Sequence, residues 1–528
     1  MVRSVERTGR MGVVKGAFVS DVRNGTEAPV LGPARRWLVL AAVSAGLLLI
    51  SVDMTVLYTA LPTLSADLGA NASQRLWIIN AYPLVMAGLL LGAGTLGDRV
   101  GHKRMYLIGL VLFGSASLVA AYATTPEILV AGRAFLAVGA AAMMPATLSL
   151  IRITFTDEHE RGIAIGVWGT MAMVGAAVGP IVGGLLLAYF WWGSVFLVNV
   201  PIVLVALALA AVVAPGGSGG SDRPWDLIGS VQVMAGLAGA VYAIKEVTGP
   251  EPRATVGLVA LVVSVAGWWT FVRRQRGRSY PLIDFALLRD PRILIGVLAA
   301  AMAMFAVAGV QLVLTQRLQL VLDLTPFHSG SVVAAMALGA LPVGVTAGAL
   351  LSRLGTRPVI GTGLLVIAAG TALVLFTSNA PLAWTVTGLL VAGAGTGAAM
   401  TAASAAIVGY APEHRAGMAS SVEEVSYELG SLTGVAILGS LLSAVYARTV
   451  ALPEGAPAEA AGGLDEARGV AAGMEEDAAA ALLAEAVHAF DSGYRATLLI
   501  AVVVLTASGL FGFLYKRGSA SETTPAQG

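Results

Sequence analysis

Residues Ile128 to Ile151 read ILVAGRAFLAVGAAAMMPATLSLI, and the only charged residue among them is Arg133. An α-helix rises about 1.5 Å per residue, so roughly 20 apolar residues cross the roughly 30 Å hydrocarbon core of a bilayer. Leu382 to Val408 is a second long run without charge, and Trp37 to Val52 is a shorter one. These stretches predict helices that cross a membrane rather than helices in the core of a soluble domain.

The composition of the whole chain agrees with this interpretation. Of 528 residues, 57% are hydrophobic and 12% are charged, whereas roughly a quarter of a soluble domain is charged. Cysteine is absent and the five histidines are scattered, which excludes disulfides and thiolate metal sites, so we expect neither a metal nor a cofactor. The polar, arginine-bearing first 35 residues lack an apolar signal-peptide core and predict a cytosolic tail.

Apolar runs bounded by charge, Gly or Pro predict fourteen spanning helices. They lie near residues 37–62, 76–97, 104–123, 127–151, 162–188, 194–214, 226–246, 255–272, 293–316, 328–351, 357–377, 382–408, 416–446 and 494–515. With both termini in the cytosol, 24 of the 32 Lys and Arg residues fall on the cytosolic side and seven on the outer side, and Arg133 lies inside a span. Because cytosolic loops are enriched in Lys and Arg, we expect a multi-pass protein of the cell's inner membrane with both termini inside.

Two segments are predicted not to span. Residues 273–292 form a basic cytosolic connection, whose apolar stretch 281–288 lies either along the membrane surface or in a solvated linker. Residues 447–493 carry nine acidic residues against Arg448 and Arg468. This second segment predicts a long outer loop, either irregular or with a helical hairpin, which either gathers cations or simply keeps the surface soluble.

Two turns in the sequence repeat one pattern of glycine and basic residues. Gly94, Asp98, Arg99, Gly101 and Lys103 recur 254 positions later as Gly348, Ser352, Arg353, Gly355 and Arg357. The copies follow the second and tenth spans, so two six-helix halves result only if the seventh and eighth spans are inserted. The predicted architecture is 6+2+6: an all-α membrane protein with a tail (1–36), a bundle (37–214), a linker and inserted pair (215–272), the connection (273–292), a bundle (293–515) and a tail (516–528).

Several short motifs accompany this pattern. The first span holds Asp53-Met54-Thr55 and Ala60-Leu61-Pro62, and the first turn runs from Gly94 to Arg104. The fourth span has Arg133 and Gly139, and the fifth has Gly175, Gly179, Pro180, Gly183 and Gly184. Further motifs are Phe196 to Pro201, Pro281 to Asp284, and Glu424 followed by Tyr427 to Gly430.

Together these motifs resemble the major facilitator superfamily, and within it the fourteen-span drug:proton antiporters similar to QacA-type quaternary-ammonium exporters. The resemblance implies the major facilitator fold, and the glycine-proline pattern of the fifth span implies an antiporter rather than a symporter. It also implies that Asp98 caps the cytosolic end of the thirteenth span, near Ala416 to Met418, in one conformational state. Tyr58 departs from the family pattern, which usually has Asn there, and its ring could stack on an organic cation.

We single out four ionisable residues of the predicted spans: Asp53, Arg133, Glu424 and Glu428. Each costs at least about 2.5 to 3.5 kcal/mol on insertion scales, so each is a functional candidate. We expect all four to take part in proton coupling, with Asp53 and Arg133 either pairing in one state or forming a permanent salt bridge. For substrate binding the candidates are Asp53, Tyr58, Glu424, Tyr427 and Glu428.

From these residues and the resemblance we expect a proton-coupled antiporter that exports small lipophilic organic cations by alternating access, as a monomer in the lipid bilayer with no nucleic-acid partner. An alternative on the same fold is a dedicated exporter of one endogenous antibiotic or lipid-like metabolite. The sequence shows no phosphate-cradling G-x-x-x-x-G-K-[ST] loop and no catalytic constellation. We therefore expect a secondary active transporter driven by the proton gradient, not an enzyme.

Overall fold

The computed structural model describes residues 32–216, 225–248, 253–283, 285–411, 416–453 and 456–514. Within these ranges the regular structure is entirely helical. Fourteen helices in the described residues are long and apolar enough to cross a membrane. This agrees with the fourteen spans predicted from the sequence.

The first six spans form an N-terminal bundle from seven helices, because the sixth span is built from α6 and α7. The helices are α1 (Pro33–Leu68), α2 (Ala72–Val100), α3 (His102–Ala121), α4 (Pro126–Thr154), α5 (Glu158–Tyr189), α6 (Ser194–Leu197) and α7 (Asn199–Val213).

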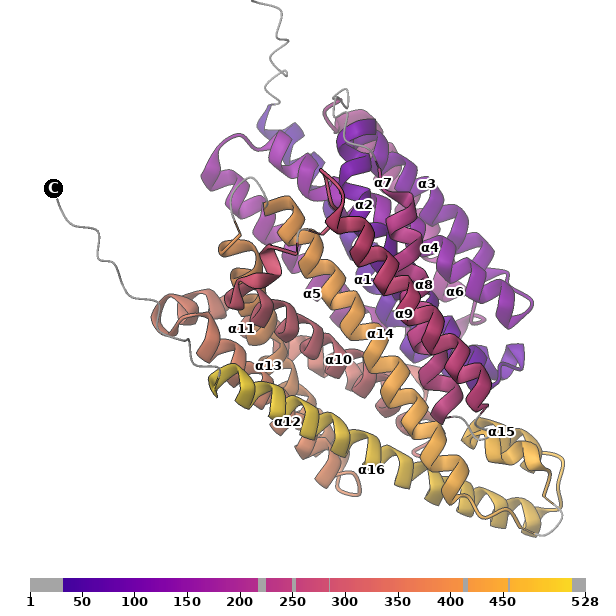
Figure 1. Cartoon of the computed structure of the whole chain (residues 1–528). Helices are drawn as coiled ribbons and strands as arrows, with labels where there is room; N and C mark the ends of the chain where they lie inside the picture. Colours follow the sequence, from indigo (N-terminus) through magenta and orange to yellow (C-terminus); the bar gives the residue numbers. More distant parts are fainter. Residues whose placement is uncertain are drawn as a thin grey trace, which may run out of the picture.

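The inserted pair is α8 (Leu227–Thr248) and α9 (Ala254–Arg276). The two helices pack on each other, and α8 also contacts α2 and α14, one helix from each bundle. Figure 1 shows the pair in front of the place where the two bundles meet. The 6+2+6 division is therefore visible in the packing.

The remaining helices form the C-terminal bundle. They are η1 (Leu287–Arg289), α10 (Pro291–Leu320), α11 (Pro326–Leu354), α12 (Thr356–Phe376), α13 (Leu382–Gly409), α14 (Ala416–Thr449), η3 (Ala458–Gly462), α15 (Leu464–Ala471) and α16 (Glu476–Leu514).

Local sequence signals fix several helix starts. Asn71 and Gln74 form a reciprocal capping box at α2, with two 2.9 Å hydrogen bonds. In α4, α10 and α11 a capping Thr or Asp is followed at once by Pro: Thr125-Pro126, Asp290-Pro291 and Thr325-Pro326. Proline suits the first helical position because its missing N–H has no partner there in any case.

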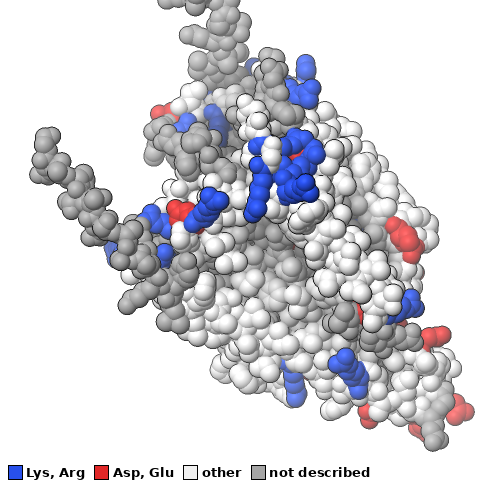
Figure 2. Space-filling view, in the orientation of Figure 1, with Lys and Arg blue, Asp and Glu red and all other residues white. Residues whose placement is uncertain are grey.

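The two ends of the molecule differ in charge. We call the end where α1 begins and α16 finishes the terminal face, and the opposite end the α15 face (Figure 1). In the view of Figure 2, Lys and Arg gather toward the terminal face, and Asp and Glu are prominent around the α15 face. This is the asymmetry that the loop composition predicts.

The segment 447–493 is more ordered than a loop. Helix α14 runs to Thr449, η3 and α15 follow, and α16 begins at Glu476, well before the predicted start of the last span at 494. Tyr446 donates a 3.0 Å hydrogen bond to the Ala460 carbonyl, and Leu464 is buried in the core of the C-terminal bundle. Residues 454 and 455 lie outside the described residues.

The apolar stretch 281–288 packs into the protein rather than lying free on the membrane. Leu282 and Leu287 are buried, and the Leu282 N–H donates a 2.6 Å hydrogen bond to Gln275 at the end of α9. The expectation of a surface-lying segment is therefore wrong for these two residues. Leu282 is buried in the core that includes the N-terminal bundle, and Leu287 is buried in the core of the C-terminal bundle, where both side chains are removed from water.

Candidate functional site

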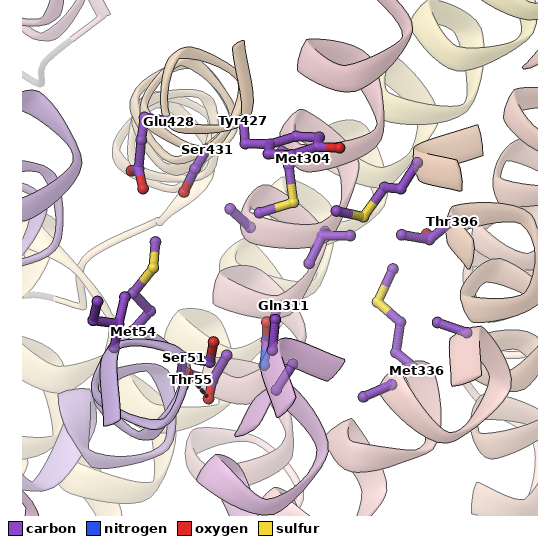
Figure 3. Close-up of a pocket in the computed structure, with 18 of the residues that line it drawn as sticks. Ser51, Met54, Thr55, Met304, Gln311, Met336, Thr396, Tyr427, Glu428 and Ser431 are labelled. Carbon is purple, nitrogen blue, oxygen red and sulfur yellow. Dashed lines mark hydrogen bonds between the residues drawn. The ribbon is translucent and has the colours of Figure 1, made fainter. Parts of the chain in front are cut away.

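A central cavity of about 270 Å³ lies between the two bundles. Helices α1, α4 and α5 line it from the N-terminal bundle, and α10, α11, α13 and α14 line it from the C-terminal bundle. Figure 3 shows residues of α1 and α14 on opposite walls. A cavity built from both bundles changes shape whenever the bundles move relative to each other.

The cavity wall is mostly apolar and rich in methionine. Five methionines line it: Met54, Met144, Met304, Met336 and Met400. Trp168, Tyr58 and Tyr427 add aromatic surface, and Gln311 and Ser431 add polar groups. Flexible, polarizable Met side chains adapt to ligands of different shape, so the wall suits bulky apolar compounds better than sugars.

Two carboxylates of α14 face this apolar space. Glu424 and Glu428 both line the cavity, as expected for residues one turn apart on one helix face. Glu428 is 6% exposed, and its Oε2 has no hydrogen-bond partner among the described residues. The charge of Arg133 attracts it electrostatically. A buried carboxylate with an unpartnered oxygen in an apolar cavity is a site for a cation or a proton.

The neighbouring Glu423 faces a different environment. The Tyr427 hydroxyl donates a 2.7 Å hydrogen bond to Glu423 Oε1, and Glu423 is not among the cavity-lining residues. This agrees with the helical spacing, which turns Glu423 about 100° from Glu424. Glu423 therefore fixes the tyrosine that borders the cavity.

The other two buried charges form an ion pair inside the N-terminal bundle. Arg133 Nη1 lies 2.5 Å from Asp53 Oδ2, and the two residues are 1% and 0% exposed. Asn199 donates a 3.1 Å hydrogen bond to the second oxygen, Asp53 Oδ1, and lies 3.2 Å from Ser117 Oγ. The Arg133 guanidinium also lies 4.7 Å from the centre of the Tyr82 ring. Both carboxylate oxygens of Asp53 thus have partners.

The predicted substrate residues divide between these two places. Tyr58, Glu424, Tyr427 and Glu428 line the cavity, whereas Asp53 lies behind its wall with Arg133. Tyr58 connects the two regions, since it lines the cavity together with Ser431 of the opposite bundle and lies within the electrostatic reach of Arg133 and Glu428. The structure places all the predicted buried charges near one interface, but not in one cavity.

The glycines of α5 bring three helices together. A side chain at Gly175 would collide with Ser51 Cβ at 2.5 Å, and one at Gly183 with Val56 at 2.6 Å, both on α1. Gly179 likewise lies against Thr55, whose hydroxyl is 3.4 Å from the Gly175 carbonyl.

Helix α5 also contacts the C-terminal bundle. Gly184 contacts the backbone of Phe327, and the carbonyl of Pro180 contacts Gly330, both on α11. The glycine-proline pattern therefore forms a close contact between the bundles, which only small residues permit.

Polar contacts reinforce this closure on the α15 face. Gln319 of α10 donates a 2.9 Å hydrogen bond to the Thr59 carbonyl of α1. Arg75 of α2 pairs with Asp465 at 3.2 Å and Glu466 at 3.0 Å, both in α15. The acidic segment thus pairs with a basic residue of the opposite bundle, and the two bundles are in contact at the α15 face.

The repeated turns have matching backbones. Gly101 has φ 99° and Gly355 has φ 78°, values that favour glycine, and each separates two consecutive spanning helices. A Cβ added at Gly94 would lie 4.0 Å from Pro145 Cβ.

In the first turn, Lys103 donates hydrogen bonds of 2.8 and 2.9 Å to the Ala211 and Ala214 carbonyls at the end of α7. Its positive charge favours that helix C-terminus. Arg99 and Arg104 are exposed.

Asp98 makes a local contact in this structure. Its carboxylate lies 3.3 Å from His102, and its side chain is 47% exposed. The predicted partner region lies partly outside the described residues, which resume at Ala416, and the side chains of Ala416 and Gly417 are not described. The role of Asp98 as a cap of α14 stays a prediction.

Sequence reasoning missed the methionine lining and the role of Asn199. Asn199 stands in the quoted motif Phe196 to Pro201, but nothing in its local sequence says that it reaches Asp53. The available signal was a polar Asn inside the apolar sixth span, two positions before Pro201. The methionines come from five different helices, so their convergence follows from packing and not from spacing.

Comparison with known proteins agrees with this arrangement. The family model described as Major Facilitator Superfamily matches residues 43–315 and 293–452. The chain is 38% identical over 492 residues to the methyl viologen resistance protein SmvA of Salmonella typhimurium, covering 91% of this chain and 99% of that protein. It is 36% identical over 505 residues to the multidrug efflux pump LfrA of Mycolicibacterium smegmatis, covering 94% and 100%.

Solved structures show the same fold at low identity. A bacterial homolog of the human lysosomal transporter Spinster, in an inward-facing and unoccupied conformation, superposes with a TM-score of 0.66 at 16% identity, covering 91% of this chain and 98% of that one. The xylose transporter XylE from E. coli, in a partially occluded inward open conformation, superposes with a TM-score of 0.58 at 12% identity, covering 91% and 98%.

Proposed function

We propose that this chain, which belongs to the Major Facilitator Superfamily and is a transporter, exports lipophilic organic cations of several structural types in exchange for protons. The observation that carries the proposal is the central cavity, in which Glu424 and Glu428 face an otherwise apolar, methionine-rich wall. An anionic group surrounded by adaptable apolar surface favours bulky cations over neutral or anionic solutes. The names of the relatives SmvA and LfrA, a methyl viologen resistance protein and a multidrug efflux pump, support the same substrate class.

Proton exchange is proposed to use the same carboxylates. A proton and a cationic compound neutralise the same charge, so binding of one lowers the affinity for the other. Asp53 and Arg133 form the second part of the coupling site, because Arg133 attracts both Asp53 and Glu428 across the bundle interface. Protonation of either acid changes how that one guanidinium charge is shared. No cofactor is needed in this scheme, because the proton gradient supplies the energy. Each charge that crosses 100 mV is worth about 2.3 kcal/mol, and the exported cation costs the same per charge, so the net drive comes from the pH difference and from protons in excess of the exported charge.

We assign the terminal face to the cytosol and the protein to the inner membrane, as a monomer. Twenty-four of the 32 Lys and Arg residues lie in segments on the side of the termini, which is the side that remains in the cytosol. The described cross-bundle contacts between α5 and α11 and between Arg75 and α15 close the opposite side. The conformation of this structure is therefore proposed to admit compounds from the cytosol. Rocking of the two bundles would then expose the cavity to the outside.

Binding to the purified protein tests the substrate class. Trp168 lines the cavity, so a bound aromatic cation should change its fluorescence. Ethidium and methyl viologen should bind the wild-type protein, and Glu424→Gln and Glu428→Gln should each weaken binding at least about tenfold, the effect of about 1.4 kcal/mol. Trp168→Phe identifies the part of the signal that comes from the cavity.

Glu246→Gln is the matched control, because it also removes a buried carboxylate, but one on α8 that pairs with Lys245 at 2.8 Å. This control should bind both cations as the wild type does. Unchanged affinity in both cavity variants would exclude the cation site. Binding of one compound alone among chemically unrelated cations would favour a dedicated exporter.

A further inference from the structure

Helix α9 carries a stripe of exposed residues that ends in two arginines. Its members are separated by three or four positions and so lie on one helix face. They are Leu258, Val262, Val265, Trp269, Arg273 and Arg276. The first four are 61%, 59%, 60% and 59% exposed, and both arginines are also exposed. In a spanning helix such a face meets lipid.

The order along this stripe matches the order of groups in a phospholipid. The apolar residues lie at membrane depth, Trp269 follows at the level where aromatic residues meet headgroups, and Arg273 and Arg276 come last. Val262 to Arg276 spans about 21 Å along the helix at 1.5 Å per residue, which is comparable to one leaflet. The Arg273 guanidinium lies 5.3 Å from the centre of the Trp269 ring, so the aromatic ring and the charge act as one unit.

The neighbouring Arg274 and Arg278 form ion pairs with the protein, whereas no ion pair of Arg273 or Arg276 is found among the described residues. Asp226, 1% exposed, accepts hydrogen bonds from Gln275 and Gly229 and pairs with Arg274 at 2.9 Å and Arg278 at 3.4 Å. These bonds tie the end of α9 to the start of α8. They leave a strong excess of positive charge, because Asp226 offsets one of the four arginines between 273 and 278.

The space-filling view shows where this excess lies. Lys and Arg gather over the end of α9 that lies at the terminal face (Figure 2). The face is therefore both apolar along its length and basic at its end.

We propose that this stripe, Leu258 to Arg276, binds an anionic phospholipid in the leaflet at the terminal face. The headgroup phosphate is bound by Arg273 and Arg276, and an acyl chain runs along Val265, Val262 and Leu258. Arginine binds phosphate through several parallel N–H donors, which favours a phosphate ligand over a general preference for the membrane surface. The site is separate from the central cavity, so it stands even if the transported substrate is of another class.

Lipid binding to the purified full-length protein tests the proposal. Native mass spectrometry should show dioleoyl phosphatidylglycerol bound to the wild type, and clearly less binding of the zwitterionic dioleoyl phosphatidylcholine. Each arginine near a charged membrane surface contributes about fivefold, so Arg273→Gln/Arg276→Gln should bind phosphatidylglycerol roughly 30-fold more weakly. Arg273→Lys/Arg276→Lys, which keeps the charge, should lie between the two.

Arg152→Gln/Arg495→Gln is the matched control, because it removes two exposed arginines of other helices, one in the last turn of α4 and one in the middle of α16. This control should bind phosphatidylglycerol as the wild type does. Displacement by inorganic phosphate alone would mean that a phosphate ion, rather than a lipid, is the ligand, and would overturn the proposal. So would equal losses in the control and the α9 variant, or equal binding of the two lipids. All the substituted side chains are exposed, and an unchanged melting temperature shows that each variant is folded.

Discussion

Asp53 and Arg133 are opposite charges without access to water, so each depends on the other. Breaking a buried pair by removing one partner typically costs about 3–5 kcal/mol, because the remaining charge is left uncompensated. Asp53→Asn should therefore lower the stability by about that amount and abolish the response of transport to a proton gradient. Unfolding in mixed micelles measures the first effect.

The double variant Asp53→Asn/Arg133→Gln separates the two effects of this substitution. It should recover much of the lost stability, because no unpaired charge remains, but it should not recover coupling. Coupling restored in the double variant would show that the pair is only structural.

Asn199 donates a hydrogen bond to Asp53 Oδ1, the carboxylate oxygen that does not contact Arg133. Losing its hydrogen bond to Asp53, 3.1 Å long, leaves a buried acceptor unsatisfied, at a cost of about 1–3 kcal/mol. Asn199→Ala should lower the melting temperature and slow transport while leaving the affinity of the cavity for ethidium unchanged. A matching loss of affinity would place Asn199 in the binding site instead.

At this scale the sequence singled out Asp53, Arg133 and Glu428, which are buried, since an ionisable residue inside an apolar run is too costly to face lipid and so turns into the protein. It did not single out Asp226 and Glu246, which are buried beside and in α8. It also predicted that Asp53 and Arg133 pair, with a permanent salt bridge as the alternative. It did not separate the cavity from the pair behind its wall, because that division depends on how α1 is rotated toward α4 and α7. Tyr58, five positions after Asp53, faces the cavity for the same reason.

Helix α5 offers a matched pair of glycines. A Cβ at Gly184 would overlap the backbone of Phe327 across the bundles, whereas a Cβ at Gly169 meets nothing within 4 Å. Gly184→Ala should weaken closure of the α15 face, and Gly169→Ala should not.

Because the chain has no cysteine, spin labels at Tyr189→Cys and Leu322→Cys, both exposed positions, can report the opening. Electron–electron double resonance should show a shift toward longer distances for Gly184→Ala only. Identical distance distributions in the two variants would contradict the role of this contact.

The network that joins α8 to α9 should be sensitive to acid. Burial raises the pKa of Asp226, but the hydrogen bonds from Gln275, Gly229 and Arg274 and the charge of Arg278 outweigh burial and hold the pKa below its ordinary value of 3.8. A carboxylate with a lowered pKa stabilises the folded state above its unfolded pKa and loses that contribution as pH falls through the folded value. The contribution should thus be complete at neutral pH and disappear below about pH 4.

Melting temperatures of the wild type and Asp226→Asn test this expectation. Asp226→Asn should be less stable at pH 6, and the difference should shrink as the pH is lowered toward 3. A constant difference across this range would exclude titration of Asp226 as its cause.

At the scale of elements, the apolar runs and the turn glycines of the sequence were sufficient to predict most of the helices. Val100 and Leu354 end helices at positions 254 apart, as the repeated turns require. The last helix was the exception, since the acidic, alanine-rich stretch after Glu476 is polar enough to read as loop. Its helical structure follows from packing of Leu482, Ala486 and Phe490 in the core of the C-terminal bundle, and no local pattern shows which surface they meet.

The whole molecule is two bundles closed on one side by α5, α11 and α15 around a cavity that contains two carboxylates. Alternating exposure of such a cavity produces export only if the proton and the compound compete for it. The exchange of protons for the compound is therefore the property to test, rather than binding or fold.

Movement of ethidium into proteoliposomes under an imposed pH gradient tests the exchange most directly. For wild-type protein, a proton gradient directed out of the vesicle should drive ethidium inward through molecules whose terminal face is outside, and a protonophore should stop it. Asp53→Asn and Glu424→Gln should respond to the gradient no more than empty vesicles do, whereas Glu246→Gln should behave as the wild type. Gradient-driven uptake that persists in both cavity and pair variants, or wild-type uptake that ignores the gradient, would contradict the account.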